Sequence, residues 1–197
     1  MQITNFIHDS FQEFYPYQSL VLFSNKCNLA CKYCYNLKEI KKEAKYDAKE
    51  ILDKHITPLH QAVTFLGGEP TLHEDLPDLL AYVKYSLNLK TKLYTNGLQP
   101  NMLEKCKNFL DEISIDFKCF NNMEILGKEI NSKRYTESIK SCIKICKNIP
   151  IEIRTTIYND MDNDELEMIK RFSEKHFKDY IVEHIFQKEF VIQQQYL

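Results

Sequence analysis

Three cysteines stand close together in the stretch "CNLACKYCYN", where Cys27, Cys31 and Cys34 are separated by three and then two residues. The chain has seven cysteines in all, an odd number that no complete set of disulfides accommodates. The N-terminal stretch does not read as a signal peptide and no apolar run could span a bilayer, so we expect a cytoplasmic protein whose thiols stay reduced. Closely spaced reduced thiols predict a metal site or a catalytic one.

The number of clustered thiols bears on what they hold. A structural zinc ion needs four ligands, so three clustered cysteines would leave one position to a residue elsewhere in the chain. Candidates for that position are His73, Cys106, Cys119, Cys142 and Cys146. A [4Fe-4S] cluster held by three thiolates leaves its fourth iron open for a substrate or cofactor. The spacing favours the cluster, with zinc and a loop of plain reduced thiols as the alternatives.

The elements that must position these thiols are short β-rich runs alternating with amphipathic helical patterns. The predicted strands cover residues 19–24, 62–66, 91–95, 113–117, 151–157 and 180–186. The predicted helices cover about 46–56, 75–86, 100–110, 134–148 and 162–177. In the last helix Asp162 is the expected N-cap, with Glu165 three residues on in a capping box.

This alternation predicts an α/β fold with parallel strands joined by right-handed crossovers. An open, partial barrel and a doubly wound sheet both fit the pattern. The chain has 197 residues, of which 44% are hydrophobic, so we expect one domain over 1–197. Its core would span about 19–187, between a short N-terminal lead-in and a C-terminal tail. The net charge of -2 argues against broad nucleic-acid binding.

The unusual residues gather where the predicted strands end. The cysteines follow the first strand, "GGEPTLH" follows the second, "TNG" closes the third and "DFK" closes the fourth. Carboxyl ends of parallel strands meet at one edge of a sheet, so these residues predict a single site. Asp116 and Lys118, two apart on a strand, share one face of it. Arg154 lies in an otherwise apolar strand, where an unpaired charge is costly to bury.

With these residues in place, the chain resembles the radical S-adenosylmethionine (SAM) superfamily. The resemblance rests on Cys27, Cys31 and Cys34, on the aromatic Tyr33 before the third cysteine, and on "GGEP" after the next strand. It implies a single-domain partial (β/α)6 barrel and an oxidoreductase. It also implies a [4Fe-4S] cluster with three Cys ligands and one open iron that binds SAM.

The resemblance implies a role for further residues. Gly67 and Gly68 would let the backbone approach the methionine part of SAM. Glu69 would accept a charge-assisted hydrogen bond from the SAM ammonium group. Tyr33 would lie against the adenine. The full expected cofactor-binding set is Tyr33, Gly67, Gly68, Glu69, Thr95, Asn96, Asp116, Lys118, Arg154 and His184.

Within the superfamily the chain resembles glycyl-radical-enzyme activases, in particular the activating proteins of anaerobic ribonucleoside-triphosphate reductases. The motifs that carry this resemblance are "FLGGEPTLHEDL", "LYTNGLQP", "ISIDFKC" and "IEIRTTI". They imply that the protein takes hydrogen from a backbone glycine of a partner anaerobic ribonucleotide reductase, and that Asp116 and Lys118 contact SAM. A flavodoxin-like or other low-potential electron donor is implied as well. Tyr94 departs from the pattern, because many activases have an acidic residue there.

Two other functions remain open from the sequence. One is a small-molecule radical SAM enzyme such as 7-carboxy-7-deazaguanine synthase, which also carries GGEP. The other is a non-enzymatic zinc-binding scaffold. The pair Asp116 and Lys118, and the run Arg154, Thr155 and Thr156, favour the activase.

Several conspicuous residues predict ordinary structural roles. Cys142 and Cys146 lie four apart on one helical face among isoleucines, which indicates buried core cysteines, and we expect the same of Cys106 and Cys119. His73 is expected on a loop surface. The acidic run "NDMDNDELE" contains no glycine for the turn of a calcium loop, so it predicts a helix start.

Overall fold

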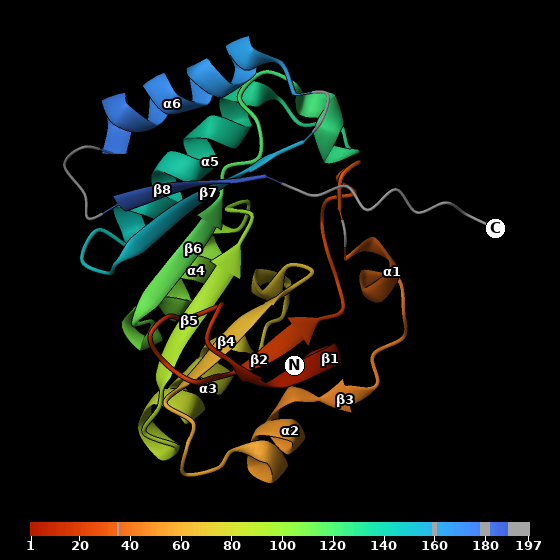
Figure 1. Ribbon diagram of the computed structural model, residues 1–197, viewed down its shortest axis with the longest axis vertical. Helices are drawn as coiled ribbons and strands as arrows, with labels where there is room; N and C mark the ends of the chain where they lie inside the picture. Colours follow the sequence, from red (N-terminus) through yellow and green to blue (C-terminus); the bar gives the residue numbers. More distant parts are fainter. Residues whose placement is uncertain (35, 159–160, 178–181, 189–197) are drawn as a thin grey trace.

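Eight strands form one sheet in the order β3-β1-β2-β4-β5-β6-β7-β8 (Figure 1). This computed structural model describes the whole chain except residues 35, 159–160, 178–181 and 189–197. From β2 onward neighbouring strands run parallel. These parallel strands are β2 (Ser19–Ser24), β4 (Ala62–Gly67), β5 (Lys90–Thr95), β6 (Glu112–Asp116), β7 (Ile151–Ile157) and β8 (Val182–Lys188).

The crossover helices lie on one face of this sheet (Figure 1). They are α2 (Ala48–His55), α3 (Leu76–Ala81), α4 (Pro100–Cys106), α5 (Ser132–Ile145) and α6 (Asn163–Phe177), with a short α1 (Leu37–Ile40) after the cysteines. Helix α3 continues as a π turn over Tyr82–Ser86, and α4 as a 3-10 turn over Lys107–Phe109. A doubly wound sheet needs helices on both faces, so the partial-barrel prediction is confirmed and that alternative is wrong.

The N-terminal segment is part of the sheet, so the prediction of a mere lead-in was wrong. Strand β1 (Gln2–Ser10) pairs antiparallel with β2, and β3 (Tyr46–Asp47) pairs antiparallel with β1. Strand β2 is buried along nearly its whole length, which requires a neighbour on each side. Strand β1 is that second neighbour, and it covers backbone groups of β2 that would otherwise form an exposed edge.

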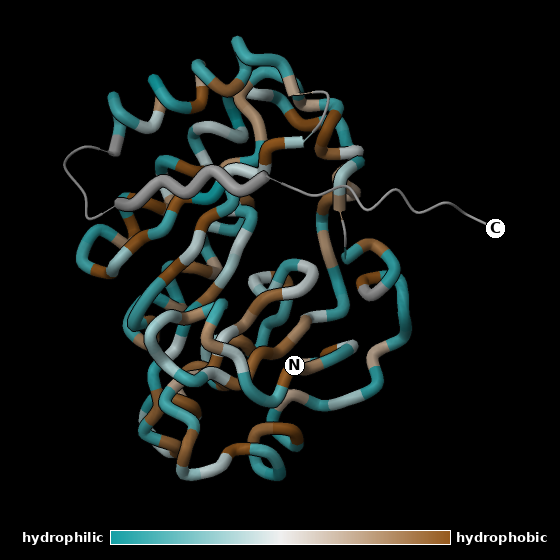
Figure 2. Tube along the Cα trace, in the orientation of Figure 1, coloured by the Kyte–Doolittle hydropathy of each residue, from teal (hydrophilic) through white to brown (hydrophobic). Residues whose placement is uncertain are grey.

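The hydrophobic core lies between the sheet and the helices. Along the strands hydrophobic residues alternate with hydrophilic ones (Figure 2). Leu93, Ile113, Ile115 and Ile153 are fully buried in this core. The four remaining cysteines also lie in this layer, as predicted: Cys106, Cys119, Cys142 and Cys146. Burial raises the pKa of the Cys106, Cys119 and Cys146 thiols to about 12, so these groups stay protonated.

The opposite face of the sheet is polar. Lys92 on β5 is buried between Glu112 of β6 and Glu152 of β7, with N–O distances of 2.7 and 3.1 Å. Phe14, from the loop between β1 and β2, is 2% exposed, and the centre of its ring lies 5.7 Å from the Lys92 ammonium nitrogen. Tyr94 donates a hydrogen bond to the backbone carbonyl of Glu13 at 2.9 Å, which fastens that loop across the open side of the sheet. None of the helices in the described part has the length and apolar character that a bilayer crossing demands.

Helix α6 corrects one predicted cap. Asp162 accepts a hydrogen bond from the backbone N–H of Asp164 at 3.0 Å, so it caps the helix as expected. Glu165 does not return to complete a capping box. Its carboxylate instead accepts from the backbone of Phe120, Asn121 and Asn122, which lie beyond the end of β6. This tertiary contact outweighs the local pattern.

Candidate metal and cofactor site

A cavity of about 180 Å³ lies at the carboxyl ends of the parallel strands, beside the loop that carries the three cysteines. Cys27, Cys31 and Cys34 all line it. The expected cofactor-binding residues that also line it are Tyr33, Gly67, Gly68, Glu69, Thr95, Asn96, Asp116, Lys118 and Arg154. His184 belongs to β8 and pairs with Ile153, but its side chain lies outside the described part of the chain. The residues that follow the predicted strands therefore do come together in one site, as the sequence predicts.

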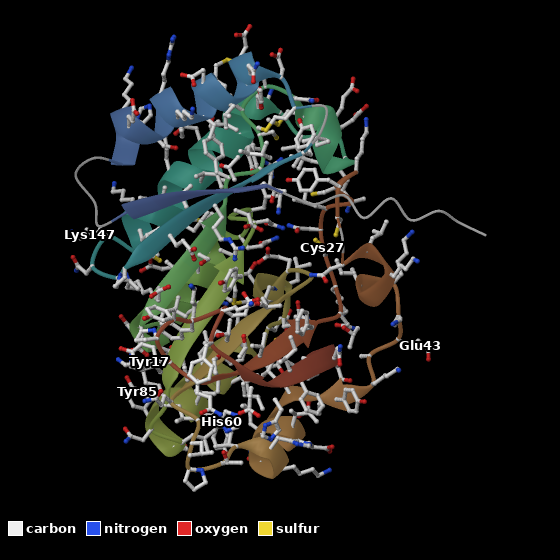
Figure 3. The ribbon with its side chains drawn as sticks, in the orientation of Figure 1. Tyr17, Cys27, Glu43, His60, Tyr85 and Lys147 are labelled. Carbon is white, nitrogen blue, oxygen red and sulfur yellow. The ribbon has the colours of Figure 1, made fainter. Side chains whose placement is uncertain are left out.

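The three thiols line the cavity but do not all converge on one point. Cys31 is buried, Cys27 and Cys34 are half-buried, and Cys27 lies on the loop that follows β2 (Figure 3). Sulfur ligands of one tetrahedral zinc ion lie about 3.8 Å apart. In the part of the chain that is described, the three cysteines do not form a group with all ligand atoms within 4.8 Å of one another. This open arrangement suits a larger cluster better than a single zinc ion.

Two further observations show that the cavity fits a bound iron-sulfur group. The Tyr33 hydroxyl is buried at the wall and has no hydrogen-bond partner among the described residues. Burial raises the pKa of the Cys27 thiol to about 11 and raises that of Cys31. Buried thiols of this kind need a cationic partner to become thiolates, and iron supplies one. The residues present therefore fit a [4Fe-4S] cluster.

The two glycines of "GGEP" have a structural reason within the chain itself. Gly67 has a φ of +107°, and a Cβ there would lie 2.6 Å from the backbone nitrogen of Ser24. A Cβ on Gly68 would lie 2.0 Å from the carbonyl oxygen of Lys26, just before Cys27. These positions bring the end of β4 against the start of the cysteine loop, which only glycine permits.

Glu69 is held in place by neighbouring donors. Its carboxylate accepts from the Thr95 hydroxyl at 2.7 Å, from the backbone N–H of Asn96 at 2.7 Å and from the backbone N–H of Thr71 at 3.2 Å. The side chain is 1% exposed, and burial raises the pKa of Glu69 although these hydrogen bonds oppose the rise. The Asn96 amide in turn donates to Asn28 of the cysteine loop at 2.7 Å. Thr95 and Asn96 thus orient the carboxylate at the cavity wall.

The charged pair at the end of β6 also faces the cavity. Lys118 donates to the Asp116 carboxylate at 2.8 Å, and its ammonium group lies 6.0 Å from the centre of the Tyr33 ring. Burial disfavours the charged ammonium, but the Asp116 carboxylate outweighs it and raises the pKa of Lys118 well above its ordinary value. The guanidinium carbon of Arg154 lies 4.8 Å from the centre of the Tyr94 ring, a cation–π contact. Tyr94, which stands where many activases have an acidic residue, therefore packs against the guanidinium group of Arg154.

Sequence reasoning missed Glu13 and misplaced His73. Glu13 lines the cavity because the loop between β1 and β2 crosses the open side of the sheet. No local sequence pattern predicts the path of that loop. His73 was expected on the surface but is 7% exposed, and burial lowers the pKa of its imidazole. The prediction failed because the 3-10 turn Pro70–Leu72, which directly precedes His73, packs against β4 and β5.

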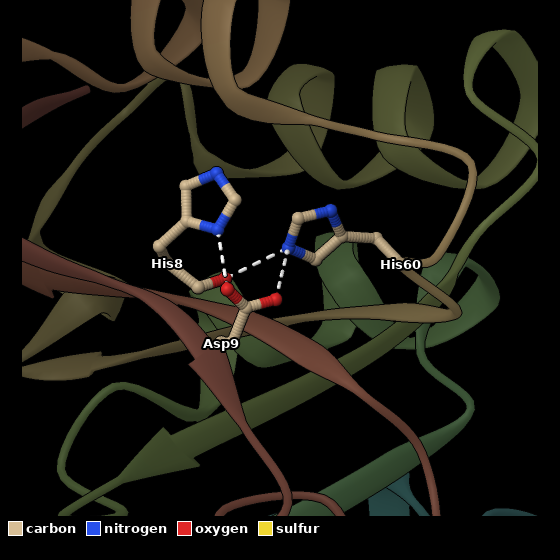
Figure 4. Close-up of side chains that lie close together, drawn as sticks. All are labelled: His8, Asp9 and His60. Atoms are coloured by element: carbon tan, nitrogen blue, oxygen red, sulfur yellow. Dashed lines mark hydrogen bonds and ion pairs between the residues drawn. The ribbon is translucent and has the colours of Figure 1, made fainter.

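A second group of potential metal ligands, His8, Asp9 and His60, has its ligand atoms within 4.8 Å of one another (Figure 4). A register shift between Ile7 and Ser10 marks an irregularity of β1 at His8 and Asp9. His60 Nδ1 accepts from the backbone N–H of Thr57 at 3.0 Å, and its Nε2 lies 2.7 Å from the His8 carbonyl oxygen. Nε2 must therefore carry the proton, where a metal would need a lone pair. This cluster is explained by its own hydrogen bonds.

Comparison with known proteins matches residues 21–173 to the model of the radical SAM superfamily. Two relatives from Methanocaldococcus jannaschii are each named "Putative glycyl-radical enzyme activating enzyme". They are 32% and 33% identical to this chain over 78% of its length, and the matches span 67% and 62% of the relatives' own lengths. An S-adenosylmethionine-dependent nucleotide dehydratase from Lacinutrix mariniflava is 31% identical over 55% of this chain and 25% of its own.

A solved structure shows the same architecture. The structure of TYW1 with a lysine-pyruvate adduct bound aligns with a TM-score of 0.58 at 23% identity, and the alignment covers 81% of this chain and 64% of that one. At this identity the similarity concerns the fold alone. It agrees with the open parallel sheet described above.

Proposed function

Because the chain belongs to the radical SAM superfamily, whose members use a [4Fe-4S] cluster and SAM, we propose that it is an activase that takes a hydrogen atom from a backbone glycine of a glycyl-radical enzyme. The observation that carries the proposal is the similarity to two relatives named as activating enzymes, which extends over 78% of this chain. We further propose an anaerobic ribonucleotide reductase as the partner, on the motifs "LYTNGLQP" and "ISIDFKC".

When held by these cysteines, a [4Fe-4S] cluster would supply the one-electron reduction of SAM, and with it the radical chemistry that removes the glycine hydrogen. The residues of this chain bind and orient the reactants. Cys27, Cys31 and Cys34 would hold three irons, and the Glu69 carboxylate would accept from the SAM ammonium group. The fixed pair of Lys118 and Asp116 would lie beside SAM.

Two polar residues of the cavity lining are suited to binding a peptide. These residues are Arg154, whose side chain is a hydrogen-bond donor, and Glu13, whose carboxylate is an acceptor. A guanidinium group donates to peptide carbonyls and a carboxylate accepts from peptide N–H groups. These two residues would position the glycine segment, with a flavodoxin-like or other low-potential protein as the electron donor.

The experiment uses the cluster-loaded protein under anaerobic conditions with SAM, a reductant and a candidate reductase. We expect slow formation of 5′-deoxyadenosine without the reductase, and faster formation together with a doublet EPR signal on the reductase when it is present. Replacing the radical-bearing glycine of the reductase with Ala should remove the doublet. A nucleotide that alone drives rapid SAM turnover and is itself dehydrated would instead support a nucleotide dehydratase, the activity named for the Lacinutrix relative.

Glu69→Ala tests the proposed ammonium contact. We expect SAM affinity to fall roughly 10- to 150-fold, because a hydrogen bond to a charged group contributes about 1.5–3 kcal/mol. Equilibrium binding of SAM to the iron-loaded variant measures the effect. Iron content should change little, since Glu69 is not among the three sulfur ligands. Unchanged affinity in a folded, iron-loaded Glu69→Ala protein would refute the contact.

A further inference from the structure

The segment Phe120–Gly127, here called the brace, runs along the outside of the cysteine loop. The backbone N–H of Ala30 donates to the carbonyl of Leu126 at 3.0 Å, and the N–H of Lys32 donates to the carbonyl of Ile125 at 2.9 Å. These two hydrogen bonds flank Cys31 on either side. The backbone around the middle cysteine is therefore fixed by carbonyl groups of the brace.

Gly127 brings the brace closer to the cysteine loop than any other residue type would allow. Its φ is +65°, and a Cβ there would lie 2.1 Å from the carbonyl oxygen of Ala30. Because the neighbouring atom is backbone, no side-chain rotation could relieve the overlap. The brace and the loop must separate if Gly127 gains a side chain.

An aromatic contact ties the brace to the third cysteine as well. The Asn122 side-chain amide donates to the Tyr158 hydroxyl at 3.2 Å. The Tyr158 ring stacks on the ring of Tyr33 with 5.3 Å between centroids and 13° between planes. Tyr33 directly precedes Cys34, so the brace reaches both Cys31 and Cys34.

The brace itself has little regular structure, only the 3-10 turn Met123–Leu126. Its N-terminal end is held by Glu165 of α6, which is 4% exposed. One Glu165 oxygen lies 3.0 Å and the other 3.1 Å from the Asn121 nitrogen, and the carboxylate also accepts from the N–H groups of Phe120 and, at 3.4 Å, Asn122. A single buried carboxylate thus gathers three successive backbone donors.

We propose that Glu165 is a positioning residue for the iron-sulfur cluster: through the brace it sets the conformation of the cysteine loop. The chain of contacts runs from the α6 carboxylate to the backbone of Phe120 to Asn122, then to Ile125 and Leu126, and then to the loop around Cys31. Glu165 itself is not among the residues that line the cavity. The proposal depends on the family's cluster and not on the identity of the partner.

The experiment compares Glu165→Gln and Gly127→Ala, which disturb the two ends of the brace, in reconstituted, cluster-loaded protein. Iron release to a chelator and the EPR spectrum of the reduced cluster, with and without SAM, are the measurements. We expect each variant to release iron roughly 10-fold faster than the parent and to change the EPR line shape, while circular dichroism stays native. Glu167→Gln is the matched control, because Glu167 lies on the same helix but is exposed and, among the described residues, pairs with Lys170 on its own helix.

The double variant separates positioning from general loss of stability. If both residues act through the brace, their effects on iron release should be non-additive, with the double variant well below the product of the two single effects. Parent-like release and EPR spectra in both single variants would overturn the proposal. Effects that simply multiply, or that occur only when circular dichroism shows unfolding, would also overturn it. If the Glu165→Gln protein does not fold, Asn121→Pro removes one of its backbone donors and takes its place in the cycle.

Discussion

Replacing Cys27, Cys31 or Cys34 with Ala is expected to abolish the [4Fe-4S] cluster and SAM cleavage together. Each thiol lines the same cavity. A cluster held by only two of them would have an additional iron without a protein ligand. Iron and sulfide content per chain measures the first loss, and 5′-deoxyadenosine formation measures the second. A Cys34→Ala protein with full iron content and full cleavage would contradict the ligand assignment.

The core cysteines provide matched controls for these variants. Cys142 and Cys146 are 1% and 0% exposed, and the Cys142 thiol donates to the Gly97 carbonyl at 3.3 Å. Neither residue lines the cavity, and Ala at either position leaves only a small gap in the core, so iron content and cleavage should remain. Loss of iron from either variant would show that these thiols do more than fill the core.

Lys92→Met is expected to lower the free energy of unfolding by about 3 kcal/mol, the low end for removing one partner of a buried ion pair. Lys92 is the cation between Glu112 and Glu152, and without it two carboxylates face each other on the polar side of the sheet. The low end applies because both carboxylates keep some exposure, 26% and 15%. Denaturant unfolding of the apoprotein measures the change.

A second substitution tests the cause of that loss. In the Lys92→Met background, Glu152→Gln should recover part of the stability, because it removes one of the two uncompensated charges. In the parent background the same Glu152→Gln change should destabilise, since it removes one of the two partners of Lys92. Two Glu152→Gln effects of the same sign and size would show that the lysine contributes through packing alone.

The strands were predictable because their residues carry a local signal. "IEIRTTI" predicts β7 with the bounds that the structure has, and "SLVLFS" does the same for β2. Strand β1 was missed because "QITNFIHDS" mixes exposed and buried positions without a regular alternation, and its irregular pairing with β2 breaks the period of two. Its place in the sheet depends on β2 needing a neighbour, which is a tertiary requirement.

The candidate site was likewise predictable where its residues follow strands, and unpredictable where they come from elsewhere in the fold. Residues that follow strands, such as Glu69 and Lys118, could be brought together by topology alone, because parallel strands end at a common edge. Glu13 could not, since it reaches the cavity from a loop that starts at the other end of the sheet. Glu165 was assigned to a local cap because the sequence shows its helix but not the distant backbone that its carboxylate binds.

The brace also has a consequence for how the protein acquires its cofactor in a cell. Glu165 is synthesised about 130 residues after Cys34, which takes roughly 7–26 s at ribosomal rates of about 5–20 residues per second. During that interval the nascent chain presents three thiols whose loop lacks support from α6, and for most of it Ile125 and Leu126 are missing as well. Cluster delivery during that interval would meet a loop without its support, so we expect productive loading to follow the emergence of Glu165 from the ribosome. Chains stalled on the ribosome before Glu165 should accept little cluster, and chains stalled well beyond it should accept more.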